Sequence, residues 1–279
     1  MATLGYSVRP IVLTTLSAIP ADCNVVAEIG PHRAYAPGEA ARLSDYLAHG
    51  GRLLIMVDPA FPLGDKLSGL LGKVGLSSEQ AIVIDPLNHY GADEEKVAIP
   101  YYPPHPITDR LALTIFPDAR PIRAEAAPVG VRTTILAASS KDSYLRPAPL
   151  AAGGAISAEP QAAPQSAPHG AAVLAVAVEG RWPDAPVDET KPFRLVLVGD
   201  ANLATNSYFP SVSNGDLVVR MIRWLADDAA RPGAQPQTFS PLQRIALTRD
   251  QMRDIFVTVE IVLPMSVVLF GGIVWWRRR

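Results

Sequence analysis

The chain has 279 residues, of which 48% are hydrophobic, and its formal net charge is -2. Because nucleic-acid binding shows as a basic excess, this balance argues against a nucleic-acid partner. A single cysteine, Cys23, excludes an intrachain disulfide framework and a cysteine-based zinc site. Residues 1–20 lack the continuous apolar run and the small-residue cleavage site of a secretory signal peptide.

The first third of the chain alternates strand and helix patterns. Residues 24–29 (NVVAEI) predict a short strand, and residues 37–49 predict a helix that ends at two glycines. Residues 53–57 (LLIMV) are apolar throughout, which is typical of a strand buried on both faces of a parallel sheet. A second helix at 65–74 and a third strand at 81–84 complete two β-α-β units. We therefore predict an α/β fold with a doubly wound, mostly parallel sheet of the flavodoxin type.

The middle of the chain is less regular. Residues 101–106 contain three prolines and cannot form a helix. Three short strands, possible members of an antiparallel extension, follow at residues 114–116, 121–126 and 133–137. Residues 147–170 are rich in Ala, Pro, Gly and Ser and predict a mobile inserted loop.

Buried-type strands return at residues 172–178 and 194–198, and a helix is expected at 214–226. We therefore divide the chain into one soluble α/β domain and three further segments. The boundaries are 1–228 for the domain with its inserted loop, 229–254 for a stalk, 255–276 for a transmembrane helix and 277–279 for a basic tail.

The terminal segment 255–276 has one charged residue in 22 positions, Glu260. As a helix it would be about 33 Å long, enough to cross a hydrocarbon core of about 30 Å. Trp275 and Trp276 lie where an aromatic belt is expected, and three arginines follow at 277–279. We therefore predict a single-pass membrane anchor.

Three features of this anchor suggest a face that docks onto another membrane subunit. Gly271 and Gly272 would allow close approach of a second helix, and Pro264 could bend the anchor. Glu260 could contact a partner, but it lies near one end of the span, and we favour the interpretation that it simply reaches the membrane surface. Three arginines lie on each side of the span, so charge alone leaves its orientation open.

Aspartates follow three of the apolar strands, at Asp58, Asp85 and Asp200. In open α/β sheets ligands bind beyond the carboxyl ends of strands, where three carboxylates could hold Mg²⁺. The simpler interpretation, which we favour, is that the aspartates close turns and cap helices.

Other catalytic patterns are missing. The sequence has no P-loop, no Gly-x-Ser-x-Gly and no Gly-x-Gly-x-x-Gly after a strand. Its five histidines are scattered without ligand spacing, and His105, between prolines, is at most a loop contact. We therefore predict no catalytic residue, no metal site and no cofactor.

Several motifs in this order resemble a known family. They are IPAD at 19–22, GP at 30–31, LSDYL at 43–47, GGRLL at 50–54, VDP at 57–59, PHPIT at 104–108, VGD at 198–200, Asn206, NGD at 214–216, IRWL at 222–225, LP at 263–264 and GIVWWRRR at 272–279. Their order resembles the auxiliary component of gliding-motility-type ABC transport systems. The soluble part is similar to the amidotransferase-like domain of an intraflagellar transport protein.

The resemblance implies a noncatalytic subunit that partners an ABC permease and an ATPase at the inner cell membrane. Its soluble domain would lie outside the cytoplasm and its C-terminus inside. Family members typically carry an N-terminal membrane helix as well, so this chain is expected to be a fragment or a shortened product. We expect partner contacts from the loops at strand ends and from one face of the anchor. The loop candidates are Asp58, Pro59, Phe61, His105, Asp200, Asn202 and Asn206.

Two further hypotheses remain open at this point. One is a membrane-tethered enzyme or ligand-binding domain that uses Asp58 and Asp200 at the strand ends. The other is a structural scaffold with no transporter attached.

Overall fold

A computed structural model describes residues 5–148, 169–186, 188 and 191–228, and the isolated positions 256, 258, 260, 264, 265, 275, 277 and 278. The chain divides into two units, Met1–Pro241 and Leu242–Arg279. Nearly all of the predicted inserted loop, the whole stalk and most of the predicted anchor lie outside the described residues.

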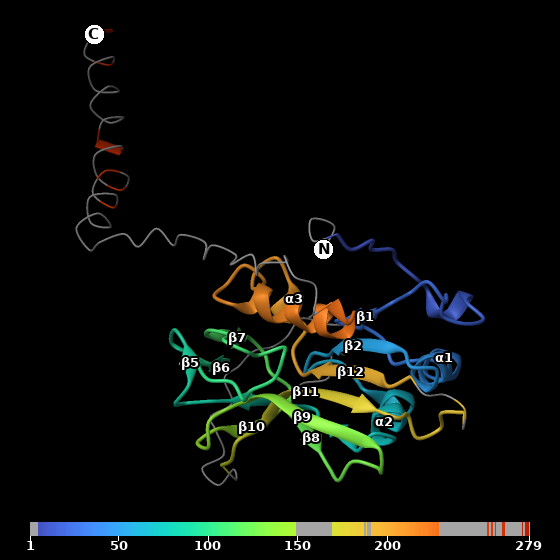
Figure 1. The fold of residues 1–279 in the computed structure, drawn as a ribbon. Coiled ribbons are helices and arrows are strands. Elements are labelled where there is room, and N and C mark those ends of the chain that lie inside the picture. The colour runs from blue at the N-terminus through green and yellow to red at the C-terminus, as the bar shows by residue number, and fades with distance from the viewer. Residues whose placement is uncertain are drawn as a thin grey trace. The chain divides into compact units, whose positions relative to one another are not determined.

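A seven-stranded sheet forms the centre of the first unit (Figure 1). Its neighbouring strands are, in order, β1 (Val26–Ile29), β2 (Arg52–Met56), β12 (Phe193–Val198), β11 (Val173–Gly180), β8 (Ile122–Ala124) and β3 (Leu76–Ser78), and β9 (Val131–Ala138) also pairs with β11. The buried β2 lies between β1 and β12 and is parallel to both. This confirms the position predicted for residues 53–57.

The rest of the sheet differs from the prediction. Strands β12, β8 and β9 all pair with β11 in the antiparallel direction, and β3 pairs with β8 likewise. The sheet is therefore mixed, and the expectation of a mostly parallel sheet is wrong. An apolar run indicates that both faces of a strand are buried, but it does not give the direction of the neighbouring strand. An antiparallel strand whose two faces are both covered has the same apolar composition.

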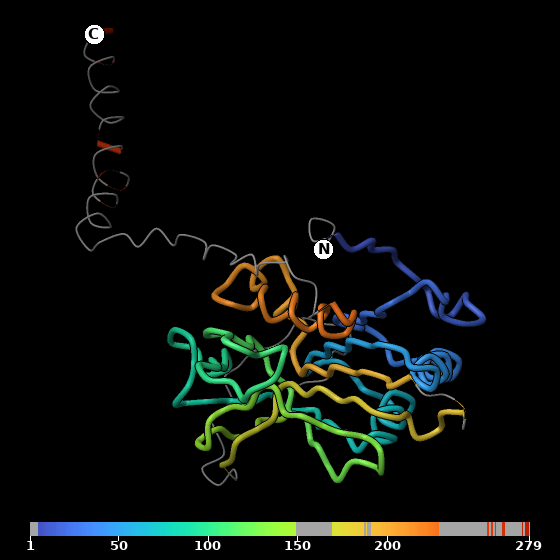
Figure 2. Tube along the Cα trace, viewed as in Figure 1, coloured from blue at the N-terminus to red at the C-terminus, as the bar shows by residue number. Residues whose placement is uncertain are grey.

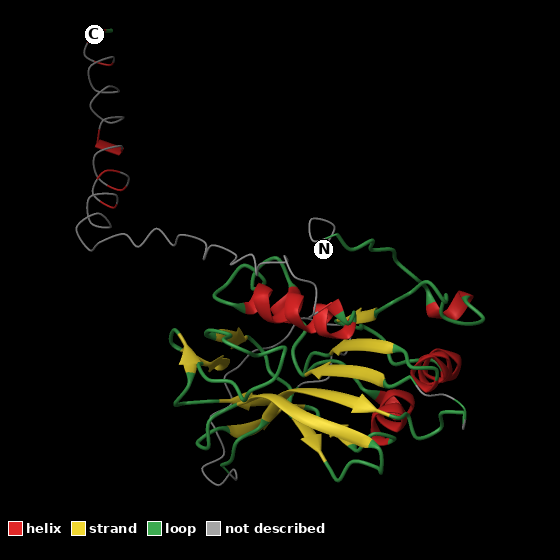
Figure 3. Ribbon diagram, viewed as in Figure 1, coloured by secondary structure: helices red, strands yellow, loops and turns green. Residues whose placement is uncertain are grey.

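Helices cover both faces of the parallel part of the sheet. On one face, α1 (Pro37–Ala48) and α2 (Gly64–Gly72) share a core with Leu53 and Ile55 of β2. On the other, α3 (Asn214–Leu225) shares a core with Leu54 and Met56, because successive side chains of a strand point to opposite faces. Figure 3 shows these few helices in red against the yellow strands. The described residues thus hold a mixed α/β fold, with helices on both faces of the parallel part of the sheet.

Two smaller sheets pack beside α3 against the second core. The first pairs β4 (Ala81–Ile84) with β10 (Tyr144–Pro147), and the second joins β5 (His89–Tyr90), β6 (Asp93–Ile99) and β7 (Thr114–Phe116). Residues 81–84, predicted as a third strand of the main sheet, therefore belong to a separate sheet.

Two 3₁₀ turns complete the described elements, η2 (Leu13–Thr15) and η3 (Asn202–Ala204). Figure 2 traces the extended segment before β1 as a dark blue tube that leads through η2 into the first strand. Leu13 is buried in the same core as α1 and α2, so η2 is packed onto the domain, whereas residues 7–10 are exposed.

Candidate functional site

The carboxyl ends of β1, β2 and β12 meet at one edge of the main sheet, because the three strands are parallel. Asp58 follows β2 and Asp200 follows β12, so the sheet brings these two predicted residues together. We call this region, residues 58–61, 117–120 and 199–206, the carboxyl edge.

Asp58 ties two neighbouring turns together. Its Oδ1 accepts a hydrogen bond from the backbone N–H of Ala201 at 2.8 Å. Its own carbonyl accepts the N–H of Phe61 at 3.1 Å, which closes the turn after β2. One carboxylate oxygen of Asp58 is therefore engaged in holding the turn after β12.

Asp200 is fully buried and accepts two backbone hydrogen bonds. Its Oδ1 accepts the N–H of Asn202 at 2.8 Å, and its Oδ2 accepts the N–H of Asp118 at 3.3 Å. Burial raises the pKa of Asp200 well above its ordinary value, and the nearby carboxyls of Asp58 and Asp118 raise it further. Asp200 thus closes its own turn and holds residues 117–120 against it.

Asp118 is a third carboxyl group at the carboxyl edge, and sequence analysis missed it. The Nδ2 of Asn202 donates to its Oδ2 at 3.1 Å. Burial is the main cause that raises the pKa of Asp118 to about 6, with Glu95 and Asp58 adding to it. Asp118 follows the three-residue strand β7, which belongs to another sheet than the strand before Asp58. Nothing in the sequence indicates that Asp118 lies at the carboxyl edge.

Arg120 organises the same region from inside the protein and was also missed. It is 2% exposed, and its Nη1 donates to the carbonyl of Phe61 at 2.6 Å. Its Nε donates to the Oγ of Ser78 at 2.8 Å, and its backbone N–H donates to the carbonyl of Gly199 at 2.6 Å. Burial lowers the pKa of Arg120 to about 10. This arginine fastens the turn after β2 to β3 and to the end of β12.

The predicted loop contacts differ in accessibility. Phe61 is 4% exposed and belongs to the core, and Pro59 is also buried. Asp58 and Asn202 are half-buried, and Asn206 is exposed. The accessible polar residues of the carboxyl edge are therefore Asp58, Asp118, Asn202, Thr205 and Asn206.

Asp85, the other aspartate predicted at a strand end, is elsewhere. It follows β4 and its carboxylate accepts hydrogen bonds from the N–H groups of Leu87, Asn88 and Ser140 and from the Oγ of Ser140. It closes a turn and does not join Asp58 and Asp200. Within the described ranges, no group of three or more His, Cys, Asp and Glu side chains is placed to hold a metal ion.

His105 does not belong to the carboxyl edge either. Its ring meets Trp224 edge-on at 5.3 Å between centroids, and the charges that act on it are those of Glu179, Arg132 and Arg194. Burial is the main cause that lowers the pKa of His105. This histidine lies near the amino end of β12, beside the last turn of α3.

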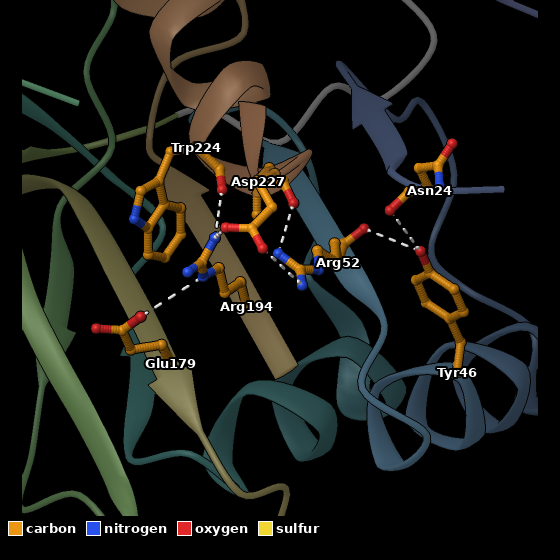
Figure 4. A network of polar contacts seen from close by, with 8 residues as sticks. Asn24, Tyr46, Arg52, Glu179, Arg194, Trp224 and Asp227 are labelled. Carbon is orange, nitrogen blue, oxygen red and sulfur yellow. Dashed lines mark hydrogen bonds and ion pairs between the residues drawn. The ribbon is translucent and has the colours of Figure 1, made fainter. Parts of the chain in front are cut away.

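Two arginines hold the C-terminal end of α3 at this opposite edge (Figure 4). Arg194 donates to the carbonyl of Trp224 at 2.7 Å and to Asp227 at 3.0 Å, and its guanidinium lies 4.8 Å from the Trp224 ring. Arg52 donates to the carbonyl of Leu225 at 3.0 Å. The cations satisfy the last carbonyls of the helix and complement its dipole.

The predicted membrane residues are described only at isolated points. Glu260 and Pro264 are two such positions, and Gly271 and Gly272 lie outside the described residues. Among the helices of the described residues, none combines the length and apolar character needed to cross a bilayer. The predicted anchor at 255–276 falls mostly outside this set and stays a prediction.

Two solved structures are similar to this chain at low sequence identity, and the first of them shares its fold. The N-terminal domain of mmIFT52 has a TM-score of 0.51 at 12% identity, covering 74% of this chain and 78% of that one. A putative ThuA-like protein from Bacteroides uniformis has a TM-score of 0.37 at 13% identity, covering 72% and 69%. No curated protein sequence matches this chain.

A family model describes most of the chain. The model of the auxiliary component of an ABC-type uncharacterized transport system matches residues 2–221, which include every strand of the main sheet and most of α3. The chain therefore belongs to the family of auxiliary components of ABC-type transport systems.

Proposed function

We propose that this chain is a noncatalytic, membrane-anchored accessory subunit of an ABC-type transport complex of the gliding-motility type, with an amidotransferase-like soluble domain. The family match over residues 2–221 is the observation that carries the proposal. In this role the subunit binds or positions a partner or substrate through the carboxyl edge. Its partners are the ABC permease, the ATPase and the lipid bilayer.

The hydrogen bonding of the carboxyl edge supports a binding role without catalysis. Asp58 and Asp200 use carboxylate oxygens to hold backbone N–H groups, and Arg120 holds backbone carbonyls. These bonds fix the loops, and a rigid loop loses less conformational entropy when a partner binds. In this proposal the half-buried carboxyls of Asp58 and Asp118 contact a positively charged partner region.

Anchoring rests on the sequence of residues 255–276. A span of this length with one charged residue fits an inner-membrane helix, and Glu260, Pro264, Gly271 and Gly272 offer a docking face for the permease. In the arrangement that we propose, the soluble domain is extracytoplasmic and the C-terminus is cytoplasmic.

Co-purification from membranes tests this function. The full chain, carrying an affinity tag, is extracted in mild detergent from cells that also produce the permease and ATPase of the same transport system. We expect both subunits to be retained, and a matched chain with Gly271→Leu and Gly272→Leu to retain less permease. Recovery of the tagged chain alone, as an anchored monomer, would contradict the proposal.

A membrane-tethered enzyme or ligand-binding domain is the second candidate, and the raised pKa of Asp118 is the observation that favours it. Perturbed carboxyls are enriched at functional sites, although structural clusters perturb them too. Titration with Mg²⁺ or Ca²⁺, followed by thermal unfolding, separates the two candidates. An increase in melting temperature that Asp58→Asn abolishes would favour a ligand site over the accessory role alone.

A further inference from the structure

Strand β1 lies at one end of the main sheet, beyond β2 (Figure 1), and among the described strands it pairs only with β2. The backbone N–H of Gly30, directly after β1, donates to the carbonyl of Met56 in β2 at 3.0 Å. Successive residues of a strand point their N–H and carbonyl groups to alternate sides. The N–H and carbonyl groups of Ala27 and Ile29 therefore point away from β2, along the outer edge of β1, where no described strand pairs with them.

The two faces of β1 differ in chemistry. Val26 and Glu28 point to the face that α1 covers, where Val26 joins the core. Ala27 and Ile29 point to the opposite face, where Ile29 is 45% exposed and Ala27 is exposed as well. The outer strand thus offers a carboxyl group on one face and an uncovered apolar surface on the other.

Two carboxyl groups and a hydroxyl gather on the α1 face, and we call Glu28, Tyr35 and Glu39 the Glu28 cluster. Glu28 is half-buried, and burial raises its pKa, with the charge of Glu39 in the first turn of α1 adding to the effect. Tyr35 is 8% exposed, and its hydroxyl is buried with no hydrogen-bond partner among the described residues. Burial also raises the pKa of Tyr35, and the charges of Glu28 and Glu39 raise it further. The unpartnered hydroxyl therefore lies near both carboxyls.

The Glu28 cluster lacks a cation. Among the described residues, no Lys, Arg or His forms an ion pair with Glu28 or Glu39. Glu39 accepts the backbone N–H of Ala36 at 2.8 Å. Two carboxyls are too few for a calcium ion, which takes six to eight oxygen ligands. An ammonium or guanidinium group carries only donors, so it can bind both carboxylates and the hydroxyl oxygen of Tyr35.

We propose that the outer edge of β1 binds an extended segment of another protein, in which a Lys or Arg lies between two apolar residues. The backbone of this segment pairs with Ala27 and Ile29 and so adds a strand to the sheet. Because side chains alternate along a strand, its basic residue reaches the Glu28 cluster while its apolar residues lie beside Ala27 and Ile29. None of these residues belongs to the carboxyl edge, so the accessory role proposed above does not depend on this site.

A second copy of this chain fits the edge less well than a basic segment does. Antiparallel pairing of two β1 strands would bring the Glu28 side chains of both copies onto the same face of the joined sheet. Like charges on neighbouring strands are destabilising, and charged residues on edge strands oppose self-pairing. A Lys or Arg in the same position is attracted instead, so the charge of the Glu28 cluster selects a basic partner segment.

Binding of synthetic peptides to the full chain in detergent tests the proposal. The probes are fluorescently labelled acetyl-STVKVTS-amide and the same peptide with Glu in place of Lys. We expect fluorescence anisotropy to show at least about tenfold tighter binding of the Lys peptide. Hydrogen exchange should slow at Ala27 and Ile29 when the Lys peptide is added. Equal binding of the two peptides, or slower exchange only outside β1, would overturn the proposal.

Two variants test the backbone and the charge separately. Ala27→Pro removes an outward N–H that makes no bond to β2, and edge strands tolerate proline. We expect it to weaken binding of the Lys peptide by about tenfold or more, whereas Ala27→Ser, which keeps the N–H, should not. Glu28→Gln should weaken it by about tenfold, and Glu125→Gln, at an exposed residue, should leave it unchanged.

Thermal unfolding of each variant checks that the domain is intact, and Glu28→Gln retains the test of the site if Ala27→Pro fails to fold. An intact Ala27→Pro or Glu28→Gln chain that binds the Lys peptide as tightly as the unaltered chain contradicts the proposal. Sedimentation of the chain without peptide tests the other occupant. A dimer that Ala27→Pro dissociates would assign the edge to a second copy and overturn the inference, and a monomer supports it.

Discussion

The carboxyl of Asp118 shows how crowding at the carboxyl edge affects stability. Its pKa in the folded protein is about 6, against an ordinary value of 3.8. The folded state therefore binds this proton more tightly than the unfolded state does. Ionisation of Asp118 lowers the free energy of unfolding as the pH rises between these two values, and the loss is complete above the folded pKa.

We expect Asp118→Asn to remove most of this loss. The amide oxygen can still accept the hydrogen bond from Asn202, but it carries no charge toward Asp58 and Asp200. Because Asp118 is partly exposed, solvent screening limits the gain to about 1 kcal/mol at about pH 7.5, with no gain at about pH 4. Urea unfolding at the two pH values measures the difference. An equal gain from the exposed control Asp109→Asn would show that the effect is not local.

The sequence predicted only two of the four residues that organise the carboxyl edge, Asp58 and Asp200, and it missed Asp118 and Arg120. Asp58 and Asp200 each follow a long apolar strand, so the rule on strand ends located both. Asp118 and Arg120 reach the same place only because β8 crosses from the smaller sheets to pair with β11 and β3. The pairing of β8 with β11 and β3 joins residues far apart in the sequence. No local pattern around Asp118 or Arg120 predicts this pairing.

Among the elements, the end of β12 is the most tightly constrained. A Cβ atom added to Gly199 would lie 1.9 Å from the carbonyl oxygen of Arg120. We therefore expect Gly199→Ala to separate β12 from residues 117–120 and to break the hydrogen bond between Arg120 N–H and the Gly199 carbonyl. A loss of about 3 kcal/mol in the free energy of unfolding is expected.

Chemical denaturation of purified protein measures this loss, and Gly69→Ala is the matched control. Gly69 is a helical residue of α2 with no atom within 4 Å of an added Cβ. There alanine should stabilise by about 0.5–1 kcal/mol, because glycine is a poor helix former. Similar effects of the two changes would contradict the close backbone contact at Gly199.

The C-terminal end of α3 depends on arginines from two strands. We expect Arg194→Met to leave the carbonyl of Trp224 without its cationic donor and to cost about 1–3 kcal/mol. Hydrogen exchange should become faster in residues 222–227 before it changes in β2. The exposed Arg181 offers a control in Arg181→Met. Unchanged exchange at Trp224 and Leu225 would mean that the hydrogen bonds from Arg194 do not hold this helix end.

The helices and strands were predicted correctly where the spacing of buried apolar residues determines the type of element. The helices α1, α2 and α3 and the strands β1, β2 and β12 lie where apolar patterns placed them. The partner of a strand was harder to predict. Residues 81–84 are apolar enough for the main sheet but pair with β10. Short strands such as β3 and β5 have few residues and mixed polarity, so they leave little periodicity to detect.

At the scale of the whole molecule, the proposed anchor predicts how the protein divides between membrane and soluble fractions. We expect the full chain to sediment with membranes and resist extraction by alkaline carbonate, and a chain ending at Asp228 to remain soluble. Immunoblotting of the two fractions measures this. Four aspartates placed between Ile261 and Val268 of the full chain should also release it. A full chain found in the soluble fraction would contradict anchoring.

The place of β12 in the sheet also has a consequence for biosynthesis. This strand pairs with β2 on one side and β11 on the other, yet it is the last strand of the described residues to be translated. Until Val198 has left the ribosome, β2 and β11 both have an open edge facing the gap that β12 will fill. Open edges of apolar strands invite pairing with other chains. We therefore expect the nascent protein to need protection against aggregation until β12 has been made.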